Sequence, residues 1–159
     1  MVSTELVAFL LPLAAKFSGY PVIPLSEVPP IRQISDKEIR ITVCPDSPDD
    51  CGGLVGLFDT EKYEIILRDD LDMDDATDNS ILLHELVHVL QFKKNGDAIF
   101  KDCPTTMKTE TEAYRAQNAY LSKEGQFRRF GEALAFMTCA GVQDTFFTKE
   151  VMIQPKLMK

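Results

Sequence analysis

The chain has 159 residues, 45% of them hydrophobic and 26% charged, which is typical of a globular protein with a real core. Its 25 acidic and 17 basic residues give a formal net charge of −8, which argues against nucleic acid or an anionic membrane as a partner. No stretch reaches the ~20 apolar residues that a membrane span needs, so we expect no membrane insertion. Residues 1–159 are predicted to form a single domain.

The first predicted element is a helix over residues 4–17, kinked or restarted at Pro12. Its ten apolar residues, 6–15, resemble the core of a signal peptide. However, Glu5 precedes them, no Lys or Arg comes before them, and no A-x-A-like cleavage site follows. We therefore expect this helix to belong to the mature protein. Four prolines within residues 21–30 then predict an extended connection.

Three short strands are predicted next. Residues 38–43 alternate polar and apolar side chains, which is the pattern of a half-buried strand. Residues 54–58 form the second strand, after two glycines, and residues 63–68 form the third, paired with the second as a hairpin. The aspartate-rich residues 69–75 lack the glycine and glutamate positions of an EF-hand loop, so we interpret them as a solvated loop.

Three helices are predicted in the second half of the chain. Their ranges are 79–94, 109–123 and 126–139. Asp78 is expected to cap the first of them, because its side chain can accept from a free backbone N–H. Thr109 and Glu112 have the S/T-x-x-E spacing of a capping box, which predicts the start of the second.

The most informative motif lies in the first of these helices. The chain has two histidines, His84 and His88, and both belong to one H-E-x-x-H motif with Glu85. Positions i and i+4 of a helix share a face, so two imidazoles there can bind one Zn²⁺. Glu85 can then act as general base on the zinc-bound water. The flanking residues are mostly apolar, which predicts a buried helix, and buried imidazoles need partners such as a metal.

A catalytic zinc ion needs a third protein ligand and an open position for water. Because the chain has no third histidine, this ligand is expected to be a carboxylate or a thiolate. The main candidate is Glu112, on the next helix, where alanines allow close packing. Glu110 is its rival, and the two lie about 200° apart around a helix, so both cannot face one metal. Asp102 and Cys103, in the preceding loop, are also candidates.

Peptide hydrolysis at this motif needs more than the metal. Glu85 would take a proton from water and pass it to the leaving amine. A second group must stabilise the oxyanion. The candidates are Tyr114, Tyr120 and Arg115. For each tyrosine, packing is the competing role. Gln91 and Gln117 lie on the two site helices and can either hydrogen-bond the ligands or serve as ordinary polar residues.

The four cysteines show no C-x-x-C spacing, which argues against a zinc knuckle or a redox motif. Cys44 and Cys51 bracket a loop rich in Pro and Asp, and Cys103 is then left to pair with Cys139. Two disulfides predict an oxidising compartment. We therefore expect a periplasmic or secreted protein whose signal peptide is not present in this sequence. A cytoplasmic protein with four reduced thiols is the competing interpretation.

The two site helices resemble a known group. H-E-x-x-H on one helix with Glu-Ala on the next is similar to the gluzincin branch of the zincin metallopeptidases, and the element order resembles its compact members, the minigluzincins. Residues 110–117 are similar to the E-x-E-A-Y-x-x-Q pattern of small bacterial proteins of this type. The resemblance covers residues 39–121. The chain departs from the large gluzincins because it lacks a downstream histidine to stabilise the oxyanion.

The resemblance implies a zincin-like α+β fold: an N-terminal helix, a small three-stranded sheet, the H-E-x-x-H helix, a Glu-bearing helix and a C-terminal helix. It implies His84, His88 and Glu112 as zinc ligands and Glu85 as general base. It also implies that residues 63–68 form an edge strand that pairs with a peptide substrate.

The predicted function is therefore zinc-dependent peptide-bond hydrolysis, with a peptide or protein as substrate. The alternative is a catalytically weak or inactive zinc-bound binding or regulatory module of the same fold. The intact Glu85 favours the peptidase, since a purely structural zinc site does not need a base. No feature of the sequence fixes an oligomeric state.

Overall fold

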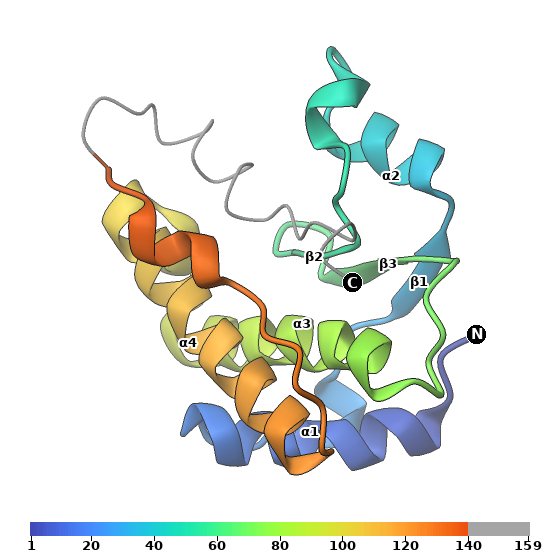
Figure 1. Ribbon diagram of the computed structural model, residues 1–159, viewed down its shortest axis with the longest axis vertical. Coiled ribbons are helices and arrows are strands. Elements are labelled where there is room, and N and C mark those ends of the chain that lie inside the picture. The colour runs from blue at the N-terminus through green and yellow to red at the C-terminus, as the bar shows by residue number, and fades with distance from the viewer. Residues whose placement is uncertain (140–159) are drawn as a thin grey trace.

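The computed structural model of the protein describes residues 1–139. Its helices and strands, in chain order, are α1 (Thr4–Ser18), β1 (Ile31–Ile34), α2 (Asp36–Val43), β2 (Gly56–Asp59), β3 (Glu64–Arg68), α3 (Ala76–Asn95) and α4 (Cys103–Lys123). Short 3-10 turns occur at Leu25–Glu27, Pro48–Cys51, Gly96–Phe100 and Glu132–Phe136. The predicted α+β class is confirmed, with four α-helices and one small sheet in the described residues (Figure 1).

Three helices build the main core. α3 lies between α1 on one side and the sheet on the other, and α4 crosses both α1 and α3 (Figure 1). Leu10 and Ala14 of α1 are completely buried, as are Ala113 and Ala116 of α4. These small α4 side chains allow the helix backbones to approach closely, which is what a site shared between α3 and α4 requires.

The sheet has the strand order β1-β3-β2, with β1 parallel and β2 antiparallel to β3. The predicted hairpin of the second and third strands is confirmed. β3 is buried on both faces: Ile65 and Leu67 join the main core, whereas Ile66 joins a second core under α2. β3 is therefore the central strand, and the prediction that residues 63–68 form an edge strand is wrong.

The first predicted strand is also wrong, because residues 38–43 lie in α2. Ser35 caps this helix by accepting a hydrogen bond from the Glu38 backbone, and the Glu38 side chain accepts from the Ser35 N–H in return. This capping box satisfies two otherwise free donors and nucleates a helix. The first strand instead occupies Ile31–Ile34, directly after two prolines in the predicted connection.

Both site helices begin earlier than predicted. Asp75, not Asp78, caps α3 by accepting from the Asp78 backbone N–H, and the Asp78 side chain accepts from the backbone of Asp72. Asp102 caps α4. The predicted capping box at Thr109 is therefore wrong, and the Thr109 hydroxyl instead donates to the Ile99 carbonyl.

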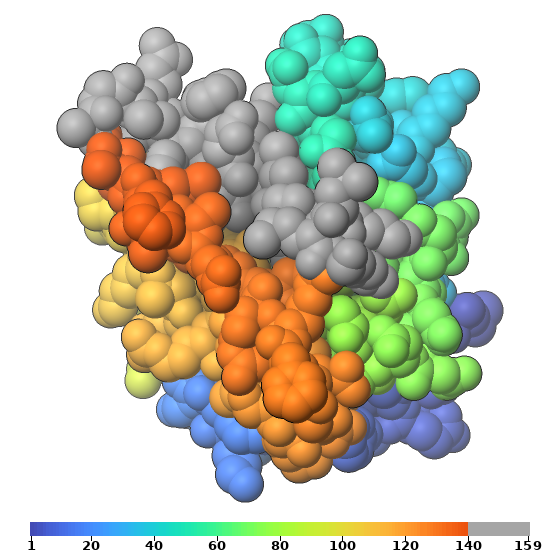
Figure 2. All heavy atoms as spheres, in the orientation of Figure 1, coloured from blue at the N-terminus to red at the C-terminus, as the bar shows by residue number. Residues whose placement is uncertain are grey.

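The prediction of a helix at residues 126–139 is wrong as well. Apart from the 3-10 turn, this segment, here called the C-terminal strap, runs back along α4 (Figures 1 and 2). Asn118 of α4 holds it by donating to the Phe130 carbonyl and accepting from the Phe130 N–H, each at 2.9 Å. Gly131 has φ +78°, which favours glycine and ends a regular helix.

Both predicted disulfides are present. Cys44 pairs with Cys51, and Cys103 at the start of α4 pairs with Cys139 at the end of the strap. Two disulfides are compatible with an extracellular or secreted protein. Within residues 1–139, no helix combines the length and the apolar character needed to cross a membrane.

Candidate metal centre

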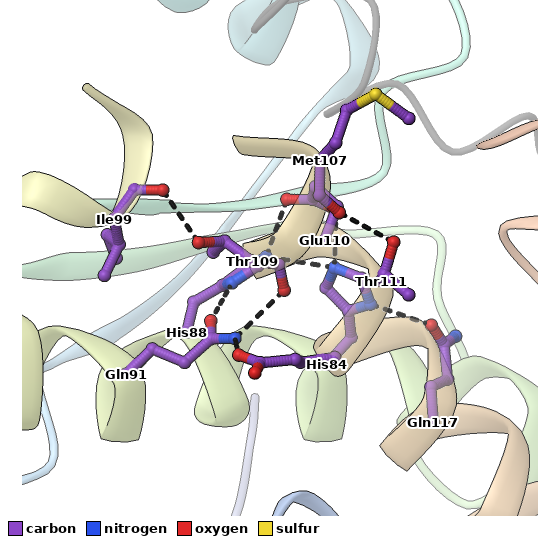
Figure 3. Close-up of polar contacts among 10 residues, drawn as sticks. His84, His88, Gln91, Ile99, Met107, Thr109, Glu110, Thr111 and Gln117 are labelled. Atoms are coloured by element: carbon purple, nitrogen blue, oxygen red, sulfur yellow. Dashed lines mark hydrogen bonds and ion pairs between the residues drawn. The ribbon is translucent and has the colours of Figure 1, made fainter. Parts of the chain in front are cut away.

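α3 places His84 and His88 one turn apart on the face that meets α4, and α4 brings Glu110 to them (Figure 3). The two histidine Nε2 atoms are 3.0 Å apart. Glu110 Oε2 lies 3.2 Å from the Nε2 of His84, and Glu110 Oε1 lies 2.9 Å from that of His88. All three side chains are at most 3% exposed. They form a buried His-His-Glu group that could hold a metal ion.

Glu110, and not the predicted Glu112, meets the two histidines in the structure. Glu112 lies two residues further along α4 and therefore on another side of the helix. Its Oε1 accepts hydrogen bonds from the Tyr20 hydroxyl at 2.6 Å and from Gln91 Nε2 at 3.0 Å. Neither Asp102 nor Cys103 reaches the histidines, because Asp102 caps α4 and Cys103 is in a disulfide.

The protonation of both imidazoles follows from their outer hydrogen bonds. His84 Nδ1 lies 3.0 Å from Gln117 Oε1, and His88 Nδ1 lies 2.7 Å from Gln91 Oε1. An amide oxygen only accepts, so each Nδ1 must carry a proton and donate it. In the neutral form of each ring, Nε2 then holds a lone pair. The two lone pairs point toward one another and toward the carboxylate (Figure 3).

These atoms fit a metal ion by three observations. Zn–N and Zn–O bonds of 2.0–2.2 Å at tetrahedral angles place ligand atoms about 3.3–3.6 Å apart, and the observed separations of 2.9–3.2 Å are slightly shorter. Glu110 Oε1 is buried and receives no hydrogen bond while the His88 ring is neutral, which is costly unless a cation compensates it. The side chains also border a cavity of about 10 Å³, roughly the space of one water-sized occupant.

The pKa values of His88 and Glu110 also indicate that this group favours a bound positive charge. Burial lowers the pKa of His88, but the Glu110 carboxylate outweighs burial and raises this pKa to about 9. For Glu110, burial raises the pKa, and the nearby His88 and His84 outweigh it and lower the pKa to about 2. Without a metal, a proton therefore supplies the positive charge that this group of acceptors favours.

Glu85 lines the same cavity and is 2% exposed. Burial raises the pKa of its carboxyl, while the two histidines and a hydrogen bond from the Phe58 backbone N–H oppose that shift. Strand β2 thus holds the carboxylate beside the histidines. Gly56 lets β2 pack closely here, because a Cβ there would lie 2.9 Å from the Leu67 side chain and 3.2 Å from that of Ile81.

The structure separates the three candidate oxyanion stabilisers. The Tyr114 ring packs edge-on against His84, with centroids 4.5 Å apart, and its pKa is raised well above the usual value, mainly by burial. Tyr120 instead donates to Asn79 Oδ1 at 2.8 Å and fills the main core. Arg115 is exposed beside the strap. Of the three candidates, Tyr114 is the one that contacts the His-His-Glu group.

Gln91 and Gln117 were expected from the sequence as possible partners of the ligands, and the structure brings both to them. Four further residues around the two histidines were not expected. Gly56, Phe58 and Phe100 line the cavity, and Ser80 accepts from Gln117 Nε2. A glycine within a strand is a recognisable signal of close backbone approach. Phe100 and Ser80 carry no comparable signal.

A family model described as Domain of unknown function (DUF6647) matches residues 6–140. No curated protein and no solved structure matches the chain. The matched residues include every side chain of the metal cluster and the cysteine that closes the strap. Since the match covers most of the 159 residues, the chain belongs to the DUF6647 family.

Proposed function

We propose that the protein is a zinc-dependent metallopeptidase, with His84, His88 and Glu110 as ligands and Glu85 as general base. The observation that carries this proposal is the convergence of two imidazole lone pairs and the Glu110 carboxylate beside a second, separately held carboxylate, that of Glu85. The resemblance of the H-E-x-x-H and Glu-Ala helices to gluzincins supports it. The two disulfides support a periplasmic or secreted location.

The donor set favours zinc. Two imidazole nitrogens and one carboxylate oxygen are a common set for catalytic zinc, which when bound lowers the pKa of a coordinated water and polarises a carbonyl. Fe(II) accepts the same donors in facial triads, so metal analysis must include iron. A structural zinc site would use four protein ligands. Three donors in the described residues leave a position for water.

Glu85 has the position and environment of a proton carrier. Its carboxylate borders the cavity between the histidines and β2, and burial raises its pKa toward the pH at which a base works best. It would accept a proton from the attacking water and return it to the leaving amine. The Phe58 N–H fixes the orientation of the carboxylate without itself contributing charge.

A peptide substrate would bind beside β2. Among residues 1–139, β3 is paired on both sides, whereas β2 pairs with β3 alone and supplies Gly56 and Phe58 to the cavity wall. An extended peptide can add to such an edge through main-chain hydrogen bonds. Tyr114, whose ring packs against His84, is the residue we assign to stabilising the oxyanion.

One observation favours a second candidate, a zinc-bound binding or regulatory module with little turnover. The cavity of about 10 Å³ is too small for a peptide bond. The side chains that surround it are only 1–3% exposed, namely His84, Glu85, His88 and Glu110. Hydrolysis therefore requires β2 and the α4 side of the cavity to move apart when substrate binds.

The test is Glu85→Gln, assayed on a broad peptide library. The amide keeps the size of the side chain but cannot accept a proton, so zinc content should persist while cleavage falls by about 100-fold or more. Glu61→Gln, at an exposed glutamate in the β2–β3 turn, serves as the control. Equal cleavage by Glu85→Gln and wild type would refute the assigned base. Zinc binding without any cleavage by wild type would favour the binding module.

A further inference from the structure

We propose that Glu112 is a positioning residue that holds the Gln91 amide with its oxygen toward His88, without touching the metal. This inference rests on the metal site proposed above and adds how one of its ligands is tuned. Four side chains form a continuous chain of contacts from the outer pocket to the cluster. In order they are Tyr20, Glu112, Gln91 and His88.

Gln91 is the central link and is completely buried. Its Oε1 accepts from His88 Nδ1 at 2.7 Å. Its Nε2 donates to the Thr109 carbonyl at 2.9 Å and to Glu112 Oε1 at 3.0 Å. Both of those partners only accept, so they select the amide orientation in which the oxygen faces His88.

The opposite orientation of Gln91 would disable the site. Its NH₂ would then face His88 Nδ1, which could only accept, and the ring proton would move to Nε2. A protonated Nε2 has no lone pair for a metal. In that orientation the amide oxygen would also face two acceptors, one of them the charged Glu112. Glu112 therefore penalises the unproductive orientation more strongly than the Thr109 carbonyl alone.

Tyr20 keeps Glu112 in place. The hydroxyl of Tyr20, just after α1, donates to Glu112 Oε1 at 2.6 Å, and Lys94 lies over the Tyr20 ring. Tyr20 and Glu112 both line an open pocket of about 270 Å³, whereas the ligands are buried. Truncating Glu112 therefore opens no closed cavity, which separates a positioning effect from loss of packing.

The hydrogen-bond chain that holds His84 ends on a different kind of group from the chain that holds His88. Gln117 Nε2 donates to the Ser80 hydroxyl, which donates in turn to the Thr77 carbonyl within α3. That chain is neutral throughout. The support of His88 ends on a carboxylate, and a charged acceptor forms the stronger hydrogen bond. We therefore expect His88 to depend on a distant side chain more than His84 does.

Two variants test the assignment. Glu112→Met removes the acceptor, whereas Glu112→Gln keeps an oxygen that can accept from both Gln91 and Tyr20. Zinc affinity, measured by competition with a chelating dye, should fall about 10-fold to 100-fold in Glu112→Met and recover largely in Glu112→Gln. Glu124→Met, at the far end of α4 where Glu124 pairs with Lys123, is the matched control and should leave the affinity unchanged.

The second readout does not depend on zinc. Nitrogen NMR of metal-free protein, at a pH where its spectrum shows a neutral His88 ring, reports which ring nitrogen holds the proton. Wild type and Glu112→Gln should carry it on Nδ1, and Glu112→Met should shift it partly to Nε2. An unchanged proton position in Glu112→Met overturns the inference. So does an equal loss of zinc in both Glu112 variants. If wild type binds no zinc, the proposed function fails, but the proton position still tests this inference.

Discussion

The α3–α4 interface and the core between the sheet and α2 bury opposite kinds of side chain. Every buried polar or charged side chain in residues 1–139 lies on α3 or α4. The sheet core is instead built from apolar residues, which are Ile34, Ile39, Leu54, Leu57 and Ile66. Burying polar groups lowers stability unless each is satisfied. The comparison indicates that the sheet core stabilises the fold, whereas the α3–α4 interface gives up stability to assemble the buried His-His-Glu group.

The largest expected effect lies in the sheet core. Ile66→Ala removes a completely buried side chain from β3 on the face turned away from α3, and should lower the free energy of unfolding by about 2–5 kcal/mol. Zinc affinity of the folded protein should change little. Denaturant unfolding and a dye competition measure the two quantities. If folded Ile66→Ala also lost zinc affinity, the sheet core and the α3–α4 interface would not be separate in their roles.

At the α3–α4 interface we expect a large loss of zinc affinity with a smaller effect on stability. His88→Ala removes a ligand and should weaken zinc binding by more than about 100-fold, beyond the range seen for residues that only support ligands. The metal-free variant should unfold at least as easily as metal-free wild type, because Glu110 loses its nearest cationic partner. Full zinc occupancy in this variant would contradict the ligand assignment.

A smaller effect is expected from Gln117→Leu. The His84 Nδ1–H loses its acceptor, so the ring is no longer held with its lone pair toward the cluster. Zinc affinity should fall about 10-fold to 100-fold. Gln126→Leu, at a glutamine after α4 whose side chain donates to the Glu124 carbonyl, is the control. Equal affinities for Gln117→Leu and the control would show that this glutamine is only a packing residue.

The smallest effect concerns protons. The pKa of His88 is raised from 6.5 to about 9, so its contribution to metal-free stability is complete below pH 6.5 and is lost as the pH rises through about 9. The lowered pKa of Glu110 contributes stability above about pH 4.5, which is lost as the pH falls toward 2.

Zinc binding must expel the His88 proton. Calorimetry in buffers with different ionisation enthalpies should therefore detect about one proton released per zinc near neutral pH, and fewer as the pH passes 9. A release independent of pH across that range would contradict the proposed His88–Glu110 coupling.

Local rules explain what was predictable from the sequence. The pair His84 and His88 followed from helix periodicity alone, because a separation of four residues places both on one face whatever surrounds the helix. The hairpin and both disulfides followed from turn residues and from the placement of four cysteines. Each of these features depends on residues close in the chain or on pairing within a very small set.

The third ligand depended on the rotation of α4, which local rules do not fix. Placing the helix start at Thr109 favoured Glu112, but α4 begins at Cys103. A signal was nevertheless present: Glu110, Ala113 and Gln117 follow the i, i+3, i+7 spacing of one buried face. This spacing places Glu110 on the same buried face as Ala113 and therefore favours Glu110 as the residue that meets the histidines.

Two other errors have tertiary or capping causes. Six alternating residues also fit one and a half turns of helix, and the Ser35–Glu38 capping box decided for α2. The predicted helix at residues 126–139 was wrong because contacts with α4 determine the backbone conformation of the strap. A Cβ at Gly131 would lie 2.3 Å from the Tyr114 ring, a contact that sequence patterns do not reveal.

The most direct test of the central claim is a crystal of zinc-loaded protein measured above and below the zinc absorption edge. We expect one strong anomalous peak, about 2.0–2.2 Å from the Nε2 atoms of His84 and His88 and from a carboxylate oxygen of Glu110. A peak coordinated by Glu112 in place of Glu110, or no peak between α3 and α4, would contradict it.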